Sequence, residues 1–278
     1  MIRGEIIKEA KLNVKLLSHT MKPELVIACA GKLCYSSSNI EDLLEKQTPE
    51  MIEKFVKMLT SMGHESPLEH CSFTFAIEGV SKSLTHQLVR HRIASYSQQS
   101  QRYVNLDKSF SYIVPNRIKE VGYIKEIFEE AMKYSFEYYV EISRKLLEVS
   151  IYNFLVEELG EYSHDTSIVE LEEVMKDKYK KKYNAFTKMA IEDARAVLPN
   201  ACETKIICTM NLRTLINFCH HRCCRRAQDE IHALAWEIVK LIKEESPLLG
   251  SCLGANCQFG ACPEGSMCCG NPYERINK

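Results

Sequence analysis

The feature that most constrains this chain is a long stretch of helical periodicity between residues 121 and 198. Apolar and charged residues recur at helical spacing in YIKEIFEEAMKYSFEYYVEISRKLLEVSIYNFLVEEL and again in ELEEVMKDKYKKKYNAFTKMAIEDARAVL, which is the pattern of amphipathic helices. The link between them, GEYSHDTS, holds glycine, aspartate and serine residues, which favour a turn. We therefore expect two antiparallel helices here, and a fold with a large helical component.

Shorter segments on both sides of this stretch alternate between strand and helix patterns. Strands are expected in KLNVKLL and ETKIICTM, and in CSFTFAIEG, where Phe73, Phe75 and Ile77 alternate with polar residues. A short helix is expected from Pro23, and a capped helix between Thr48 and Gly63. Ser81 and Asn211 are placed to cap two further helices, and AQDEIHALAWEIVKLIKEE predicts a last one.

This order of elements predicts an α+β fold: a single domain with a mixed or antiparallel sheet flanked by long helices. We expect that domain to span residues 1–249 and to include the long helical segment around 121–193. Residues 250–278 then form a cysteine- and glycine-rich C-terminal tail that lacks core periodicity. We expect deletion from Gly250 onward to leave the chemistry of the protein largely intact.

Charge and composition narrow the classes of partner. The formal net charge is −1, from 36 basic and 37 acidic residues, so no global field favours nucleic acid or a membrane surface. No apolar run is long enough to span a bilayer. The N-terminal segment carries acidic residues and lacks a signal-peptide core, so we expect a cytoplasmic protein whose 13 cysteines are thiols rather than disulfides.

One polar segment, RHRIASYSQQSQRY from Arg90 to Tyr103, has little to contribute to a core. We expect it where a helix runs out into a loop. Arg90 and Arg92 diverge on a continuous helix, but both can point into one cleft if the helix ends there. Arginine presents a planar fork of donors that suits phosphate, and the serines and glutamines add further polar groups. The segment indicates a site for a ligand with several phosphates, or for two ligands side by side.

The spacing in this segment resembles the signature of the flavin-dependent thymidylate synthases: Arg-His-Arg, two residues, Ser, four residues, Ser, one residue, Arg. Three further blocks are similar to the same family and occur in the same order. They are GHESPLEHCSFTF from Gly63, ARAVLP from Ala194, and NLRTLINFCHHRCCRRAQDEI from Asn211. Two positions depart from the pattern: Gln98 stands where other members carry glutamate, and Arg226 where some carry histidine.

The resemblance implies an enzyme that makes dTMP from dUMP. In that family the methylene group comes from methylenetetrahydrofolate, and the electrons come from NADPH through bound FAD. It also implies a homotetramer with shared active sites and no metal. The residues it implies for dUMP are Gln87, Arg90, Gln98, Ser100, Arg102, Arg195 and Arg222. The residues it implies for FAD are His64, Ser66, Arg90, His91, Arg92, Gln98, Asn211, Arg213, Asn217 and Arg226.

Arg222 is the expected catalytic residue. The reaction makes C5 of the uracil ring nucleophilic, so negative charge develops on the pyrimidine. A fixed guanidinium beside the ring stabilises that charge best where water is excluded, and one such donor is typically worth about 3–4 kcal/mol. Cys223 and Cys224 lie beside arginines that could lower a thiol pKa. The family pattern, however, implies no covalent cysteine.

Two alternatives come from other classes of protein. The segment CHHRCCRR, together with the tail cysteines, could form a metal-binding module that binds nucleic acid. The tail spacing of C-x4-C-x4-C-x5-C-C matches no common zinc site, and the net charge argues against nucleic acid. A flavodoxin-like electron carrier is the other alternative, but no glycine-rich phosphate loop follows a strand.

Overall fold

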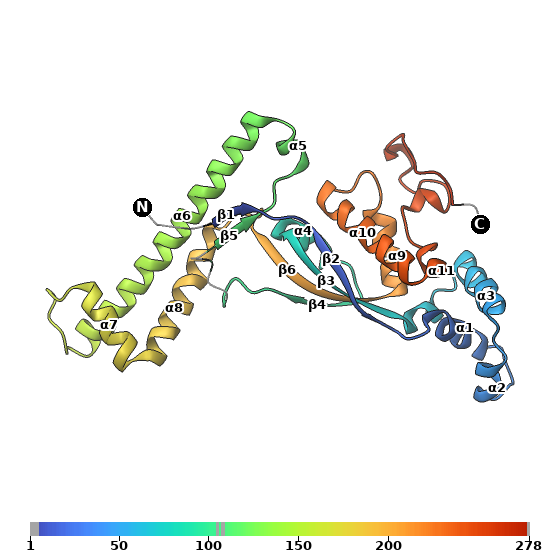
Figure 1. Ribbon diagram of the computed structural model, residues 1–278, viewed down its shortest axis with the longest axis horizontal. Coiled ribbons are helices and arrows are strands. Elements are labelled where there is room, and N and C mark those ends of the chain that lie inside the picture. The colour runs from blue at the N-terminus through green and yellow to red at the C-terminus, as the bar shows by residue number, and fades with distance from the viewer. Residues whose placement is uncertain (1–5, 104–105, 107–108, 277–278) are drawn as a thin grey trace. The chain divides into compact units, whose positions relative to one another are not determined.

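The structure is a computed structural model that describes residues 6–103, 106 and 109–276. The chain divides into two compact units (Figure 1). The sheet unit comprises residues 11–98 and 204–278, and the helical unit comprises residues 1–10 and 99–203. Each contains helices and strands, so the expected α+β class is confirmed. Within the described ranges, the helices are all too short or too polar to cross a membrane.

The sheet unit is built on four strands in the order β2-β3-β6-β4. Their bounds are Asn13–His19 for β2, Ser72–Ser81 for β3, Ala94–Gln98 for β4 and Glu203–Asn211 for β6. β2 runs antiparallel to β3, and β4 antiparallel to β6. The sequence patterns locate β2, β3 and β6.

β4 corrects the expectation that the segment after Arg90 is a loop. It forms because residues 94–98 pair with β6, from Ala94 opposite Met210 to Gln98 opposite Ile206. The partners are more than a hundred residues apart in sequence, and β4 lies at the edge of the sheet. An edge strand with polar side chains gives little periodic signal.

The helices of the sheet unit have the expected capping residues. The bounds are α1 Pro23–Leu33, α2 Ile40–Glu45, α3 Pro49–Met62, η1 Ser66–His70, α4 Lys82–Leu88, α9 Leu212–Arg222, α10 Asp229–Glu245, α11 Pro247–Gly250, η4 Asn256–Gln258 and η5 Gly265–Met267. Thr48, Ser81 and Asn211 each accept a backbone N–H at a helix start. Gly63 ends α3 with φ of 72°, in the left-handed region that favours glycine.

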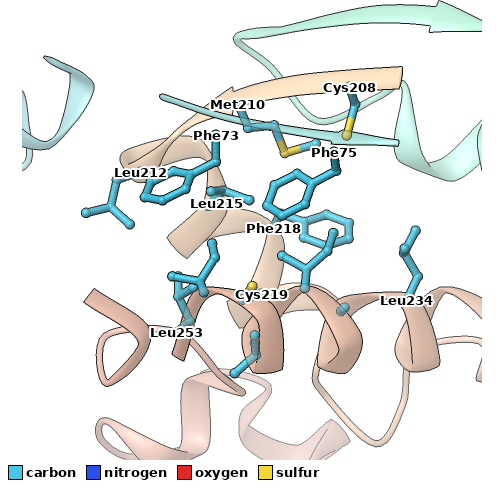
Figure 2. Packing of buried hydrophobic residues seen from close by; sticks show 14 of the residues in the cluster. Phe73, Phe75, Cys208, Met210, Leu212, Leu215, Phe218, Cys219, Leu234 and Leu253 are labelled. Carbon is cyan, nitrogen blue, oxygen red and sulfur yellow. The ribbon is translucent and has the colours of Figure 1, made fainter. Parts of the chain in front are cut away.

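The core of the sheet unit lies between the sheet and the helices α9 and α10 (Figure 2). Alternate residues of β3, including Phe73 and Phe75, are fully buried. Leu215 and Phe218 from α9 and Leu234 from α10 complete the packing in the same cluster. Strand and helix periods therefore direct their apolar faces into one core.

The tail contributes to this same core. Leu253 and Ala255 are fully buried in the cluster, and Figure 2 shows Leu253 beside the helices. A deletion from Gly250 would remove both side chains and expose the apolar surface they cover. Such a deletion should therefore destabilise the fold, and the expectation that it leaves the chemistry intact stays a prediction.

The helical unit contains a small parallel sheet and a group of helices. Strand β1 (Ile6–Glu9), which the sequence patterns did not indicate, pairs with β5 (Ser109–Tyr112). The helices are α5 Asn116–Lys119, α6 Gly122–Tyr152, the π-helical turn η2 Asn153–Glu158, α7 Ile168–Lys178, α8 Lys180–Ala194 and η3 Arg195–Val197. Phe110, Phe136 and Tyr139 form a buried cluster in this unit.

The second long helix expected here is two helices, α7 and α8, which meet at Tyr179. Tyr179 leaves helical geometry with φ of −123° and ψ of 36°. Its ring packs edge-on to Phe154 at 5.3 Å between centroids, and its hydroxyl donates to Glu161. These long-range contacts favour a break that the local sequence does not signal. The antiparallel arrangement of α6 and α8 agrees with the expectation (Figure 1).

Candidate functional site

A cavity of about 670 Å³ lies in the sheet unit, lined by the segment after α4, the end of α9 and the tail. We call it the arginine cavity, because five arginines line it and Glu264 is the one acidic residue among its described lining residues. The arginines are Arg90, Arg92, Arg222, Arg225 and Arg226. Three histidines and five cysteines also line it: His91, His220, His221, Cys224, Cys257, Cys262, Cys268 and Cys269. This excess of positive charge suits an anionic ligand.

The end of α4 brings Arg90 and Arg92 into the same cavity. The helix closes with a turn in which the N–H of His91 donates to the carbonyl of Leu88 at 3.1 Å. The hydroxyl of Tyr96, on β4, lies 2.8 Å from that carbonyl and 2.9 Å from the carbonyl of His91. The tyrosine thus fixes the turn from the edge strand. Both arginines line the arginine cavity, as expected if the helix ended there.

His91 and Arg222 meet inside this cavity. Arg222 Nε donates to His91 Nε2 at 3.0 Å, and its Nη1 donates to Gln87 Oε1 at 3.3 Å. Burial, with the charge of Arg222 and the neighbouring His221, lowers the pKa of His91 from 6.5 to about 4. A side-chain hydrogen bond with Asn217 opposes this shift. His91 is therefore neutral at physiological pH, and its Nε2 can accept the hydrogen bond from Arg222 Nε–H.

Arg222 is the last residue of α9, and its side chain is partly buried. Burial and the charge of Arg90 lower the pKa of its guanidinium, which stays protonated because the ordinary value is so high. Its partners His91 and Gln87 orient it without cancelling its charge. The arrangement can stabilise a negative charge that develops in the cavity.

Several residues that the family resemblance assigned to FAD lie outside the described lining of this cavity. Arg213 is exposed and forms ion pairs with Glu65 at 2.8 Å and with Glu69 at 2.5 Å. Asn211 uses its side-chain oxygen to cap α9. His64 and Ser66 are exposed around the start of η1. Their assignment to FAD stays a prediction.

Gln98 also lies outside that lining and has structural partners. Its amide nitrogen donates to Thr85 Oγ1 at 3.0 Å and to Thr204 Oγ1 at 3.3 Å. These contacts join the end of β4 to α4 and β6. Its roles toward dUMP and FAD stay predictions as well.

Three residues assigned to dUMP, Ser100, Arg102 and Arg195, belong to the helical unit, and two of them contact Glu192 of α8. Arg102 forms a two-pronged ion pair with Glu192, with Nε 2.5 Å from one carboxylate oxygen and Nη2 3.1 Å from the other. Arg195 Nε donates to the backbone carbonyl of Glu192 at 3.1 Å. Ser100 Oγ accepts the backbone N–H of Arg102 at 3.1 Å. Glu192 therefore contacts both Arg102 and Arg195, and Ser100 contacts the backbone of Arg102.

The tail supplies lining residues that the sequence patterns did not indicate. Arg226 Nη1 donates to Glu264 Oε2 at 2.8 Å and to the carbonyl of Met267 at 2.6 Å. Tyr273 packs under the guanidinium of Arg225 at 4.1 Å, and its hydroxyl lies 3.0 Å from His232 Nε2. No local motif marks these partners, because glutamate and tyrosine in a glycine-rich segment are ordinary surface residues.

Comparisons with known proteins extend over nearly the whole chain. A family model described as "Thymidylate synthase complementing protein" matches residues 15–248. A flavin-dependent thymidylate synthase of Clostridium tetani is 50% identical over 267 residues, covering 96% of each chain. One of Geobacter sulfurreducens is 41% identical over 264 residues, covering 95% of this chain and 96% of its own.

A solved structure agrees with the fold. The UMP/dUMP methylase PolB of Streptomyces cacaoi, solved with 5-Br dUMP bound, superposes with a TM-score of 0.64. The match covers 89% of this chain and 96% of that one, at 18% sequence identity. At this identity the likeness concerns the fold alone.

Proposed function

Because this chain belongs to the flavin-dependent thymidylate synthase family, we propose that it converts dUMP to dTMP with bound FAD, methylenetetrahydrofolate as the carbon donor and NADPH as the reductant. The observation that carries this proposal is the meeting of the Arg90–His91–Arg92 turn with Arg222 in one cavity. Two segments that resemble the family signature, far apart in sequence, thus supply one site.

The residues of the arginine cavity fit a flavin dinucleotide. Its volume of about 670 Å³ lies in the range typical of small-molecule sites. The guanidinium groups of Arg90 and Arg92 suit the diphosphate, and His91 and Asn217 offer hydrogen bonds beside them. When bound, FAD supplies the electrons that reduce the transferred carbon to a methyl group.

Arg222 acts on the pyrimidine in this proposal. Its guanidinium opposes the negative charge that develops on the uracil ring as C5 becomes nucleophilic. His91 and Gln87 hold it by hydrogen bonds, so little reorganisation is needed as the charge forms. A carboxylate partner would have cancelled part of the field that the reaction needs.

Ser100, Arg102 and Arg195 bind the phosphate of dUMP in this proposal. A phosphate can accept the same two parallel hydrogen bonds that Glu192 now accepts from Arg102. Binding therefore exchanges one anion for another at this guanidinium. Arg195, held close by through Glu192, adds a second positive charge.

We further propose that the protein works in the cytoplasm as a homotetramer with shared active sites. Sites built from more than one subunit would give residues outside the arginine cavity, such as His64 and Arg213, a ligand to contact. Analytical ultracentrifugation tests the tetramer, since a monomeric active enzyme would contradict it.

Anaerobic incubation with dUMP, methylenetetrahydrofolate and NADPH tests the function. We expect dTMP as the product, a yellow preparation with flavin fluorescence, and dependence of turnover on added FAD. Arg222→Ala should retain the flavin and lose dTMP formation. A wild-type preparation that stays colourless with FAD and consumes no NADPH would refute the proposal.

A further inference from the structure

Five cysteines line the arginine cavity, and the thymidylate chemistry proposed above uses none of them. Two, Cys262 and Cys268, flank the short turn η5 (Gly265–Met267) of the tail. Both residues line the cavity, and a side-chain hydrogen bond between the two thiols contributes to the pKa shift of each. Cys262 is half-buried and Cys268 is exposed, so small molecules can reach the pair.

The turn between the two thiols is stabilised by its own backbone hydrogen bonds and by Arg226. Backbone bonds from Met267 N to Glu264 O at 2.9 Å and from Cys268 N to Gly265 O at 3.1 Å close it. Arg226 binds Glu264 and the Met267 carbonyl from the cavity side. A fixed turn keeps the two sulfur atoms together rather than letting the chain separate them.

The tail is also anchored beyond this turn. Tyr273 lies against Arg225, at 4.1 Å, and against Trp236, with ring centroids 5.2 Å apart. The N–H of Ile276 donates to the carbonyl of Gln258 at 3.0 Å. Leu253, which precedes the two thiols in sequence, is buried in the core. The segment that carries both thiols is therefore anchored before Cys262 and after Cys268.

The surroundings shift the pKa values of the two thiols in opposite directions, which favours Cys268 as the nucleophile and Cys262 as its partner. Hydrogen bonding from the backbone at Gly270, then from the Cys262 thiol, lowers the pKa of Cys268, and the nearby Arg226 adds to this. A backbone hydrogen bond at Glu264 also lowers the pKa of Cys262, but the hydrogen bond with Cys268 and burial outweigh it and leave that pKa raised. A thiolate at one sulfur beside a thiol at the other is the arrangement of reactive dithiols.

The positions of the side chains favour a dithiol over a metal site. Among residues 6–103, 106 and 109–276, no three or more His, Cys, Asp or Glu side chains are grouped so as to hold a metal ion. Cys262 and Cys268, by contrast, line one wall of the cavity on the two sides of the closed turn η5. We propose that Cys262 and Cys268 are a redox-active dithiol in the wall of the arginine cavity, which small-molecule disulfides convert to an intramolecular disulfide.

The exchange balances without further reactants. The Cys268 thiolate attacks one sulfur of a small disulfide RSSR, forms a mixed disulfide and releases RS⁻, which takes up the proton lost by Cys268. The Cys262 thiol then loses its proton and attacks the Cys268 sulfur, which expels the second RSH. The two cysteines lose two electrons and two protons in total, and RSSR becomes two RSH.

Oxidised glutathione is the probe, applied to the full-length protein at neutral pH and followed by intact-mass measurement and native thiol titration. Wild type should lose two reactive thiols and gain no lasting glutathione adduct, because Cys262 displaces it. Cys262→Ser should instead accumulate one glutathione per chain on Cys268. Cys262→Ser/Cys268→Ser should show neither change, and Cys269→Ser, the neighbouring control, should behave as wild type.

Other results would overturn the proposal. An intramolecular disulfide that survives in Cys268→Ser would assign the chemistry to Cys224 with Cys262. Its loss in Cys269→Ser would assign it to the adjacent pair 268–269. One equivalent of zinc per purified chain, released by Cys262→Ser, would make the cluster a metal site. Circular dichroism of each variant shows whether it is folded before its thiols are compared.

Discussion

Arg222 donates its Nε–H to Nε2 of His91 across 3.0 Å, so a neutral imidazole orients the guanidinium at the end of α9. The two residues come from segments that the chain separates by 131 positions. Carboxylates hold other arginines of this protein, including Arg102 and Arg213. A neutral partner fixes the direction of Arg222 while leaving its charge available to a ligand.

Replacing Arg222 and Arg92 should separate methyl transfer from flavin binding. Arg222→Ala should lower kcat by roughly 10²–10³, as for removal of one preorganised donor, and leave the flavin content of the protein unchanged. Arg92→Ala should release flavin on gel filtration. Arg117→Ala, an exposed arginine of the helical unit, is the control. Equal flavin loss in the Arg222 and Arg92 variants would show that their roles are assigned wrongly.

His91 should titrate far below an ordinary histidine. Its pKa is lowered from 6.5 to about 4, mainly by burial, so the unfolded chain binds its proton at a higher pH than the folded chain does. Stability from this group is therefore complete above about pH 6.5 and is lost as the pH falls through about 4. NMR titration of the His91 ring, assigned by comparison with His91→Gln, measures this. A midpoint near 6.5 would contradict the burial and the acceptor role.

Arg102 should serve the nucleotide and not the flavin. Hydrogen bonds to charged groups contribute about 1.5–3 kcal/mol, so Arg102→Ala should raise the Kd of dUMP by about tenfold or more. Calorimetric titration with dUMP measures the change, and flavin absorbance provides the second readout. Arg102→Lys should recover only part of the affinity, because lysine lacks the planar fork. Unchanged dUMP affinity in Arg102→Ala would exclude this residue from the phosphate site.

Glu230 should stabilise the start of the helix that carries Gln87. Its carboxylate accepts the N–H of Ser81 at 2.6 Å and the Ser81 hydroxyl at 2.7 Å, and Ser81 is buried. Glu230→Ala leaves that N–H without this acceptor and should cost about 1–3 kcal/mol of unfolding free energy. Urea denaturation tests this against Glu237→Ala, a variant that loses a surface ion pair to Lys240 at 3.4 Å. Equal midpoints for the two variants would refute it.

Leu253 should be the residue through which the tail supports the core. Leu253→Ala is expected to lower the free energy of unfolding by about 2–5 kcal/mol, the usual cost of a fully buried leucine. Leu33→Ala, at a position 50% exposed, should cost much less. Thermal denaturation of both variants decides the matter. A truncation that begins after Ala255 is consequently the better test of whether turnover needs the rest of the tail.

Local sequence predicted the features that depend on neighbouring residues. Thr48, Ser81 and Asn211 were expected as caps and act as caps, because a capping side chain bonds to a backbone N–H three residues on. The joint position of Arg90 and Arg92 followed from one helix end. Strands β3 and β6 were expected from their sequences, and their residues alternate between buried and more exposed positions.

Features that depend on distant partners could not be predicted in this way. Strand β4 exists through pairing with β6, and the break at Tyr179 through contacts with Phe154 and Glu161. Leu253 lies in a segment of glycines, cysteines and scattered apolar residues that has no helix or strand period, and its burial depends on packing against distant helices. The bond between Arg226 and Glu264 likewise joins two ordinary surface residue types.

Glu192 and Glu264 give this protein its own internal counter-ions. Glu192 forms an ion pair with Arg102, and Glu264 forms one with Arg226. In each pair the carboxylate occupies the position beside the guanidinium that a phosphate could take. Because each carboxylate belongs to the same chain, it competes for the guanidinium at a high effective concentration. A dissolved anion must therefore bind the guanidinium more strongly than the carboxylate does, through its charge or its geometry. Simple anions such as chloride are poor competitors under that condition, whereas a phosphate with several acceptor oxygens is a good one. At the phosphate sites proposed above, this competition would set a minimum affinity that an anion has to exceed in order to bind.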